Sequence, residues 1–188
     1  MVGAGSGERA FSPLSYSLRK RLPWLNVNLA TAFAAAAVVA FFEDTIAKLT
    51  VLAVFLPVIA GQGGNAGAQS LAIVMRGLVM REISRQRVAS LIMKEAVLGI
   101  INGAITGTIT GLIAWLWYGN ALLGLVIALG MLINLFFAGL AGASIPLAMK
   151  RLGLDPAQCS SIILTTITDV IGFLAFLSLA VMFFDRLI

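Results

Sequence analysis

Five long apolar runs constrain the fold of this chain more than any other feature of its sequence. They cover residues 25–42, 49–80, 88–117, 121–149 and 158–184. A helix that crosses a bilayer needs about 20 mostly apolar residues, and more when it is tilted. The runs therefore predict an all-α integral membrane protein with five transmembrane helices, located as a multi-pass protein in the plasma or inner membrane. The second run is so long that we expect its helix to be tilted, broken or preceded by a turn.

The composition agrees with a membrane protein. Hydrophobic residues make up 60% of the 188 residues and charged residues only 11%, whereas about a quarter of the residues in a soluble domain are charged. A net charge of +5 would favour nucleic acid as a partner of a soluble protein, but membrane proteins carry Lys and Arg as orientation signals. We therefore expect the lipid bilayer, and no nucleic acid, as a partner.

The available side chains exclude several catalytic chemistries. The chain has no histidine and a single cysteine, Cys159, so histidine-based zinc sites and Ser-His-Asp triads are impossible. A metal site would have to use oxygen ligands, which suit hard cations such as Mg²⁺ and Ca²⁺. Because no nucleophile–base pair is visible either, we predict that the protein is not an enzyme.

Basic residues indicate the orientation of the spans. Eleven of the thirteen Lys and Arg residues fall before the first span, around the second-to-third connection, or between the fourth and fifth spans. They are Arg9, Arg19, Lys20, Arg21, Arg76, Arg81, Arg85, Arg87, Lys94, Lys150 and Arg151. Because Lys and Arg favour the cytoplasmic side, the N-terminus is predicted to be cytoplasmic and the C-terminus external. Residues 1–20 are expected to form a flexible leader, and residues 21–188 the five-helix domain.

The fifth predicted span contains an acid, Asp169, near its middle. An ionisable residue at bilayer depth is costly and marks a functional site by default. Ser161 and Thr165 precede it by two turns and one turn, and Thr168 and Gly172 lie on nearly the same helical face. The stripe predicts the wall of a hydrated path, with a protonated Asp169 in a structural hydrogen bond as the alternative. In a two-fold dimer, two such aspartates would supply the charge that a divalent cation needs.

The second predicted span contains a polar, glycine-rich stretch, PVIAGQGGNAGAQ, at residues 57–69. Its GQGGNA segment fits the G-x-G-x-x-[GA] dinucleotide pattern, but a βαβ unit is impossible between membrane-length apolar runs. Irregular backbone in a membrane is buried in protein or lines a cavity. The stretch therefore predicts either an unwound, oxygen-rich segment at a pore or a very close helix crossing. The residues expected at the pore are Gly61, Gln62, Gly63, Gly64, Asn65 and Gln69.

Glycines at a strict spacing of four residues characterise the third predicted span. They are Gly99, Gly103, Gly107 and Gly111. Such rows let helix backbones approach closely in lipid, so they predict packing rather than chemistry. Glu95 precedes the row, either as a solvated interfacial acid or as an acid that attracts cations at the cytoplasmic mouth. Asn134 in the fourth span is predicted to form a packing hydrogen bond.

Four stretches resemble the transmembrane domain of the MgtE magnesium channels. They are FLPVIAGQGGNAGAQSLAIVMRGL, DPAQCSSIILTTITDVIGF, RLPWLNVNLATA and KEAVLGIINGAITG, and the resemblance covers roughly residues 20–185. It implies a homodimer of five-helix protomers whose second and fifth helices line a pore. By this resemblance Asp169 would hold hydrated Mg²⁺, and Thr165 and Ser161 would lie one and two turns before it. Asn65 would belong to the pore-lining stretch, and Glu95 matches an acid of the third helix.

The chain departs from the family pattern near the implied ion site. Ile162 stands at a position that is often proline, and Ser161 replaces an asparagine or glycine, which changes the ligands expected there. Many members also carry a cytoplasmic N domain and paired CBS domains that sense magnesium. Neither is recognisable in this sequence, which indicates a naturally short member or a truncated form.

The resemblance favours one function over two others. The leading hypothesis is a magnesium-selective channel with a dimeric pore, in which Mg²⁺ and other divalent cations are transported and no catalytic cofactor is needed. The alternative is a Na⁺-coupled transporter or exchanger of Mg²⁺ or another divalent cation. A third hypothesis, from a different class, is a membrane assembly subunit that transports nothing.

Overall fold

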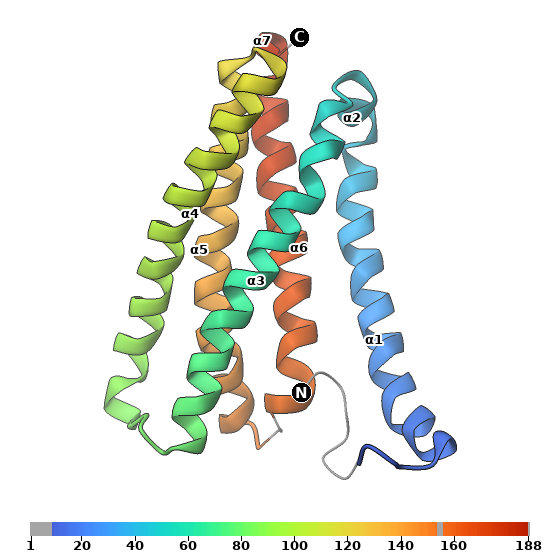
Figure 1. Cartoon of the computed structure of the whole chain (residues 1–188), viewed down its shortest axis with the longest axis vertical. Coiled ribbons are helices and arrows are strands. Elements are labelled where there is room, and N and C mark those ends of the chain that lie inside the picture. Colours follow the sequence, from blue (N-terminus) through green and yellow to red (C-terminus); the bar gives the residue numbers. More distant parts are fainter. Residues whose placement is uncertain (1–8, 154–155, 188) are drawn as a thin grey trace.

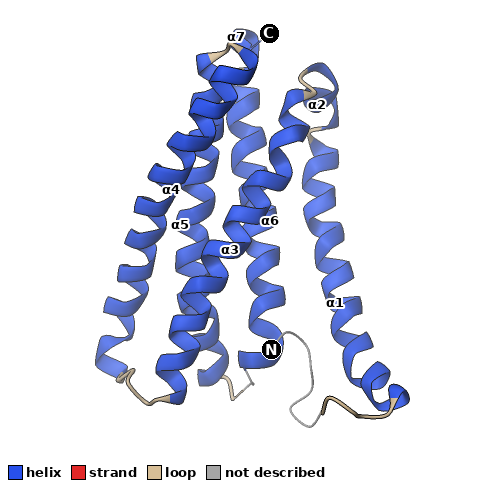
Figure 2. Ribbon diagram, viewed as in Figure 1, coloured by secondary structure: helices blue, strands red, loops and turns tan. Residues whose placement is uncertain are grey.

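Every regular element in the described part of the chain is a helix (Figure 2). The computed structural model describes residues 9–153 and 156–187, without the side chains of residues 157–159. The elements are α1 (Leu14–Phe41), α2 (Glu43–Lys48), α3 (Val51–Val79), the 3-10 helix η1 (Arg85–Arg87), α4 (Val88–Tyr118), α5 (Ala121–Arg151), α6 (Pro156–Met182) and α7 (Phe184–Leu187). Five helices in this part are long and apolar enough to cross a membrane. The all-α class and the number of spans are therefore confirmed.

Helix α1 begins well before the predicted first span. It starts at Leu14, directly after Pro13, and includes residues 14–20 that we had assigned to the flexible leader. Leu, Arg and Lys are good helix formers, and the glycines of the leader all precede residue 8. The assignment of residues 14–20 to the leader was therefore wrong, and residues 1–8 lie outside the described part of the chain.

Helix α5 lies at the centre of the bundle, and α1 lies at its margin (Figure 1). α5 packs against α3, α4 and α6, whereas the main partner of α1 is α6. Phe55 of α3, Met131 of α5 and Phe176 of α6 are buried in the main apolar cluster. The fold is thus a compact group of four helices with a fifth helix attached along α6.

Glycines bring α4 and α5 into backbone contact. A Cβ atom on Gly103 would lie 2.8 Å from the Cα of Leu132, and one on Gly107 would lie 2.7 Å from the carbonyl oxygen of Ala128. Ordinary carbon contacts are about 3.5–4.0 Å long, so no larger residue fits without moving the helices apart. The predicted packing role of the glycine row is confirmed. The turn between the two helices is closed by Asn120, whose Oδ1 accepts hydrogen bonds from the backbone N–H groups of Leu122 and Leu123 in the first turn of α5.

The glycine-rich stretch at residues 57–69 is not unwound. α3 runs through it without a break and contains Pro57, so the predicted irregular segment is wrong. Helices in a bilayer tolerate Pro and Gly because neighbouring helices and side chains satisfy the freed backbone groups. The close crossing, which was the other possibility, is found at Gly63 and Gly67. A Cβ on Gly67 would lie 2.7 Å from the side chain of Leu164 on α6.

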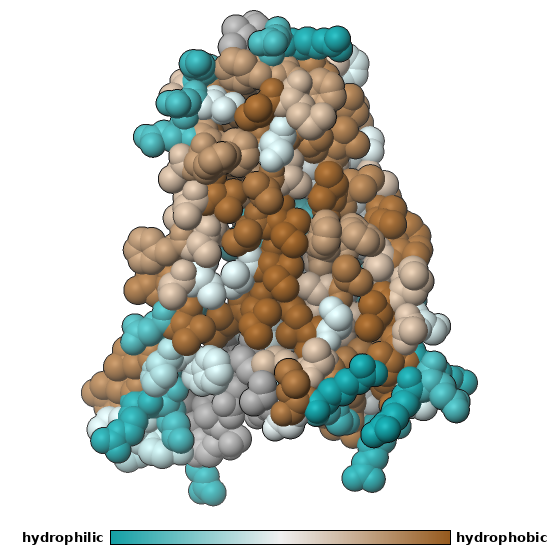
Figure 3. Space-filling model, turned by 180° about the vertical axis from the view of Figure 1, so that it is seen from behind, coloured by the Kyte–Doolittle hydropathy of each residue, from teal (hydrophilic) through white to brown (hydrophobic). Residues whose placement is uncertain are grey.

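Hydrophilic side chains gather at the two ends of the bundle, and an apolar band lies between them (Figure 3). One end contains η1 and the first residues of α1 and α6, and the other contains α2, α7 and the turn between α4 and α5 (Figure 1). The eleven basic residues that were predicted to share one side belong to the η1 end, and Lys48 and Arg186 belong to the other. The structure thus reproduces the separation of charge, while the cytoplasmic placement of the η1 end stays a prediction.

Candidate functional site

Asp169 lines a polar pocket between α6 and α1. The pocket has a volume of about 250 Å³. Asp169 is half-buried, and among the described residues it is the only charged one that lines this pocket. Thr165 and Thr166 of α6 and Asn28 and Thr31 of α1 supply the other polar groups. Because a water molecule occupies about 30 Å³ in the liquid, the pocket has room for a cation together with several of its waters.

The hydroxyl groups that precede Asp169 have three different environments. Thr165 is exposed and shares the pocket, and its Oγ1 donates a hydrogen bond of 3.0 Å to the Ser161 carbonyl. Thr168 is fully buried, and its Oγ1 donates to the Thr165 carbonyl at 3.1 Å. Ser161 Oγ is buried and has no hydrogen-bond partner among the described residues. Thr165 is therefore the predicted ligand that the structure places with Asp169, since a hydroxyl that donates to a carbonyl keeps its lone pairs for a ligand.

Two of the glycines predicted to line the pore, Gly63 and Gly172, face the side chain of Asn134 instead. A Cβ on Gly63 would lie 2.9 Å from Asn134 Cγ, and one on Gly172 would lie 2.8 Å from the same atom. Asn134 is 0% exposed, and its Nδ2 donates a hydrogen bond of 2.8 Å to the Ile59 carbonyl of α3. The amide thus joins α3, α5 and α6, and it confirms the predicted packing hydrogen bond. Within the protomer, these two glycines contact Asn134 and Thr168 is buried, and their place at a pore stays a prediction.

The remaining polar residues of the glycine-rich stretch form one exposed face of α3. Gln62, Asn65 and Gln69 are exposed and follow one another at spacings of three and four residues, which places them on the same side of the helix. Gly61 and Gly64 have nothing within 4 Å of the position of a Cβ. Because α3 stays helical here, its backbone carbonyls remain in helical hydrogen bonds, and the side-chain amides are the groups that this face offers.

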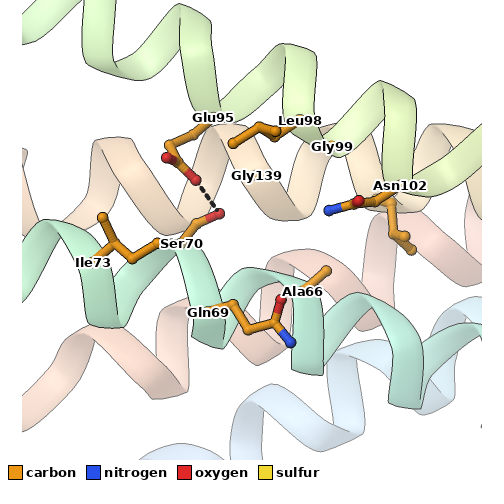
Figure 4. A pocket seen from close by; sticks show the side chains of 10 residues that line it. Ala66, Gln69, Ser70, Ile73, Glu95, Leu98, Gly99, Asn102 and Gly139 are labelled. Carbon is orange, nitrogen blue, oxygen red and sulfur yellow. Dashed lines mark hydrogen bonds between the residues drawn. The ribbon is translucent and has the colours of Figure 1, made fainter.

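Glu95 lies inside the bundle and not in a solvated interface. It is 2% exposed, and its Oε2 accepts a hydrogen bond of 2.8 Å from Ser70 Oγ of α3. The alternative of a solvated interfacial acid is therefore wrong. The backbone at Glu95 also packs closely against α5, because a Cβ on Gly139 would collide with the Glu95 backbone carbonyl group. Figure 4 shows the carboxylate pointing toward Ser70 at one end of a small pocket, with Asn102 and Gln69 farther along it.

The two pockets offer oxygen and amide groups around single acids. Within the described residues, no three His, Cys, Asp or Glu side chains gather in a way that could hold a metal ion. Mg²⁺ dehydrates reluctantly and is usually bound by one or two carboxylates with several waters retained. The donor set around Asp169 therefore suits a hydrated cation in passage better than a dehydrated ion held permanently.

Sequence reasoning missed the contribution of α1 and of Ser70. Asn28 and Thr31 are three residues apart in an apolar span, and this spacing places them on one helical face. That signal was available, but it does not say which helix the face meets. The pairing of Ser70 with Glu95 joins residues 25 positions apart, and no local pattern in the sequence indicates it.

Comparisons with known proteins agree with the sequence resemblance. A family model described as MgtE, divalent cation transporter, matches residues 56–179. Three curated relatives are each named magnesium transporter MgtE. The protein of Enterococcus faecalis is 36% identical over 183 residues, that of Bacillus subtilis 34% over 168, and that of Thermus thermophilus 32% over 160.

The alignments cover most of this chain but a minority of each relative. They include 97%, 89% and 85% of this chain, in the same order, and 40%, 37% and 35% of the relatives. The chain therefore spans about two fifths or less of the length of the curated relatives that it matches.

Proposed function

Because this chain belongs to the MgtE family of divalent cation transporters, we propose that it carries Mg²⁺ across the cell membrane as a channel whose pore forms between two copies of the chain. Asp169 is the residue on which selectivity depends in this proposal. Thr165 and the exposed amide face of α3, with Asn65 at its centre, line the same path. The relatives' printed name supports Mg²⁺ as the transported ion.

The position of Asp169 supports the proposal most strongly. The carboxylate lies near the middle of a membrane-length helix and lines a pocket with four neutral polar residues. No described residue donates a hydrogen bond to it or pairs with it. A structural aspartate would need such a partner, since leaving a polar group unsatisfied in hydrocarbon costs several kcal/mol. A passing cation with its waters would satisfy the carboxylate.

A second copy of the chain would complete the site. One carboxylate and a few neutral oxygens carry too little charge for a divalent cation, whereas a two-fold axis beside α6 would double the acid. α3 presents Gln62, Asn65 and Gln69 on its exposed face, so the protomer has a polar surface that would otherwise meet lipid. A second copy that covers this face would remove the free-energy cost of exposing polar side chains to lipid.

A Na⁺-coupled transporter is the second candidate, and it would use the same acid. The two mechanisms differ in what drives the ion: a channel passes Mg²⁺ down its own electrochemical gradient, whereas coupled transport stops without sodium. A membrane assembly subunit that transports nothing would use Asp169 only to stabilise contacts between copies.

Mg²⁺ flux into liposomes that contain the purified chain tests the proposal. Asp169→Asn should lower the flux about 10- to 100-fold, because interactions with a charged group contribute about 1.5–3 kcal/mol. Asp185→Asn is the matched control, since Asp185 is exposed outside the five spans. The same vesicles are measured with and without a sodium gradient.

Three results would be decisive. Unchanged flux and ion preference in Asp169→Asn would remove the basis of the proposal. An absolute sodium requirement would exclude the channel in favour of the coupled transporter. Altered dimer stability in Asp169→Asn, with no Mg²⁺ flux above that of empty vesicles for either the wild type or the variant, would support the assembly subunit.

A further inference from the structure

Glu95 has a buried oxygen that the fold leaves without a hydrogen bond. Ser70 Oγ satisfies Oε2, but Oε1 is buried and has no hydrogen-bond partner among the described residues. An unsatisfied buried oxygen of a charged group costs more than about 1–3 kcal/mol. A carboxylate kept inside a bundle at such a cost needs a compensating positive charge.

Lys94 supplies a positive charge that is easily withdrawn. Its Nζ lies 3.5 Å from Glu95 Oε1, while the Lys94 side chain is 61% exposed. Only the lysine end of this pair is in contact with solvent, and a long lysine side chain can turn outward to the polar end of the bundle. Lys94 therefore places a positive charge beside Glu95 that can move away. One positive charge is enough to balance the single carboxylate.

We propose that Glu95, Ser70, Gln69 and Asn102 form a binding site for a small monovalent cation such as Na⁺, which replaces Lys94 as the counter-charge of Glu95. Ser70 and Glu95 hold one end of the site, and the amide oxygens of Gln69 and Asn102 complete it together with water. The amides line the same pocket as the acid (Figure 4). The site shares no lining residue with the pocket of Asp169, although Gln69 also belongs to the exposed face of α3 that is proposed to line the pore.

The size of the pocket and its charge select this ligand. The pocket has a volume of about 80 Å³, enough for a cation with one or two waters, since each water occupies about 30 Å³. A divalent cation would leave an excess positive charge beside a single buried carboxylate. A proton on Oε1 would neutralise the acid but would use none of the amides. A monovalent cation satisfies the charge and the oxygen ligands together.

Thermal unfolding of the purified full chain in detergent tests this site without any transport assay. Na⁺ is titrated against choline at constant ionic strength, and Mg²⁺ is titrated in parallel. Na⁺ should raise the unfolding midpoint of the wild type. In Lys94→Met, which removes the competing lysine charge, the Na⁺ concentration that gives half of the rise in the unfolding midpoint should fall about fivefold, the equivalent of a competing interaction of about 1 kcal/mol. Glu95→Gln, which retains an acceptor for Ser70, should show no Na⁺ response.

Asp169→Asn separates this inference from the proposed function. In this variant Na⁺ should still raise the unfolding midpoint, whereas Mg²⁺ should no longer do so. If both ions still raise the midpoint, the result contradicts the Mg²⁺ site at Asp169 but not the Na⁺ site at Glu95. The inference is overturned if Na⁺ stabilises neither the wild type nor Lys94→Met, or if Glu95→Gln responds like the wild type. It is also overturned if the response that depends on Glu95 follows Mg²⁺ or pH instead of Na⁺. Should Glu95→Gln fail to fold, Ser70→Ala must weaken the Na⁺ response in its place.

Discussion

Replacing Gly63 with alanine should destabilise the protein, whereas the same replacement at the adjacent Gly64 should not. A Cβ on Gly63 would lie 2.9 Å from Asn134 Cγ, but a Cβ on Gly64 would have nothing within 4 Å. Both residues belong to α3, so the gain in helix propensity, about 1 kcal/mol, is the same for both. The pair therefore isolates the effect of the close contact.

The cost at Gly63 follows from how firmly Asn134 is held. Contact at about 3.5–4.0 Å requires the amide to retreat by roughly 1 Å or more, because its Nδ2 lies closer to the new Cβ than its Cγ does. It cannot do so freely, because Gly172 lies against its other side and its Nδ2 is bonded to the Ile59 carbonyl. Overpacking costs about 1–3 kcal/mol, and loss of the hydrogen bond about 0.5–1.5 kcal/mol. After the propensity gain of about 1 kcal/mol, the net loss for Gly63→Ala is about 0.5–3.5 kcal/mol, against a gain of up to about 1 kcal/mol for Gly64→Ala.

Reversible unfolding in mixed micelles, followed by circular dichroism, measures both free energies. Gly63→Ala combined with Asn134→Ala should be more stable than the sum of the two single effects predicts, because the second change removes the atoms with which the new methyl group collides. Equal stability of Gly63→Ala and Gly64→Ala would refute the close packing of the Asn134 side chain between α3 and α6. Strict additivity in the double variant would refute it as well.

Three further substitutions test other contacts. Asn28→Leu should lower Mg²⁺ flux about fivefold, the equivalent of one neutral hydrogen bond of about 1 kcal/mol, while Asn26→Leu, which alters no residue of the Asp169 pocket, should leave the flux unchanged. Gly139→Ala should lower the free energy of unfolding by about 1–3 kcal/mol, because the methyl group would collide with the Glu95 carbonyl; a neutral result in the same unfolding assay would contradict the close packing of α4 and α5. Asn120→Ala should cost about 0.5–2 kcal/mol through loss of the cap of α5, and an unchanged unfolding midpoint would show that the cap contributes nothing.

The parts of the fold that depend on period and length could be predicted from the sequence. Apolar runs of membrane length predicted the five spans, and the row of glycines from Gly99 to Gly111 predicted a close helix contact. Both predictions were possible because the length of a run and the spacing of glycines are properties of a single helix. The stripe that leads to Asp169 is local as well, but only Thr165 shares the pocket of Asp169, whereas Thr168 is buried. The separation of Lys48 and Arg186 from the other basic residues followed from counting connections.

The parts that depend on the neighbour of a helix could not be predicted in this way. Gly63 and Gly64 look alike in the sequence, yet one faces Asn134 and the other open space. The backbone of Glu95 packs against Gly139, 44 residues later in the chain. The same glycines are compatible with an unwound segment and with a tight helix crossing. Which of the two forms depends on the helix that packs against them. Asn28 was missed for the same reason, since its partner α6 is the last span of the chain.

The marginal place of α1 has a consequence for biosynthesis. α1 is made first, and its main partner, α6, is the last of the five spans to be made. The first helix must therefore stay in the bilayer by its own apolar length while more than a hundred residues are synthesised. Contacts over such a sequence separation form late. The pocket of Asp169, which needs both helices, thus forms only after α6 has been made.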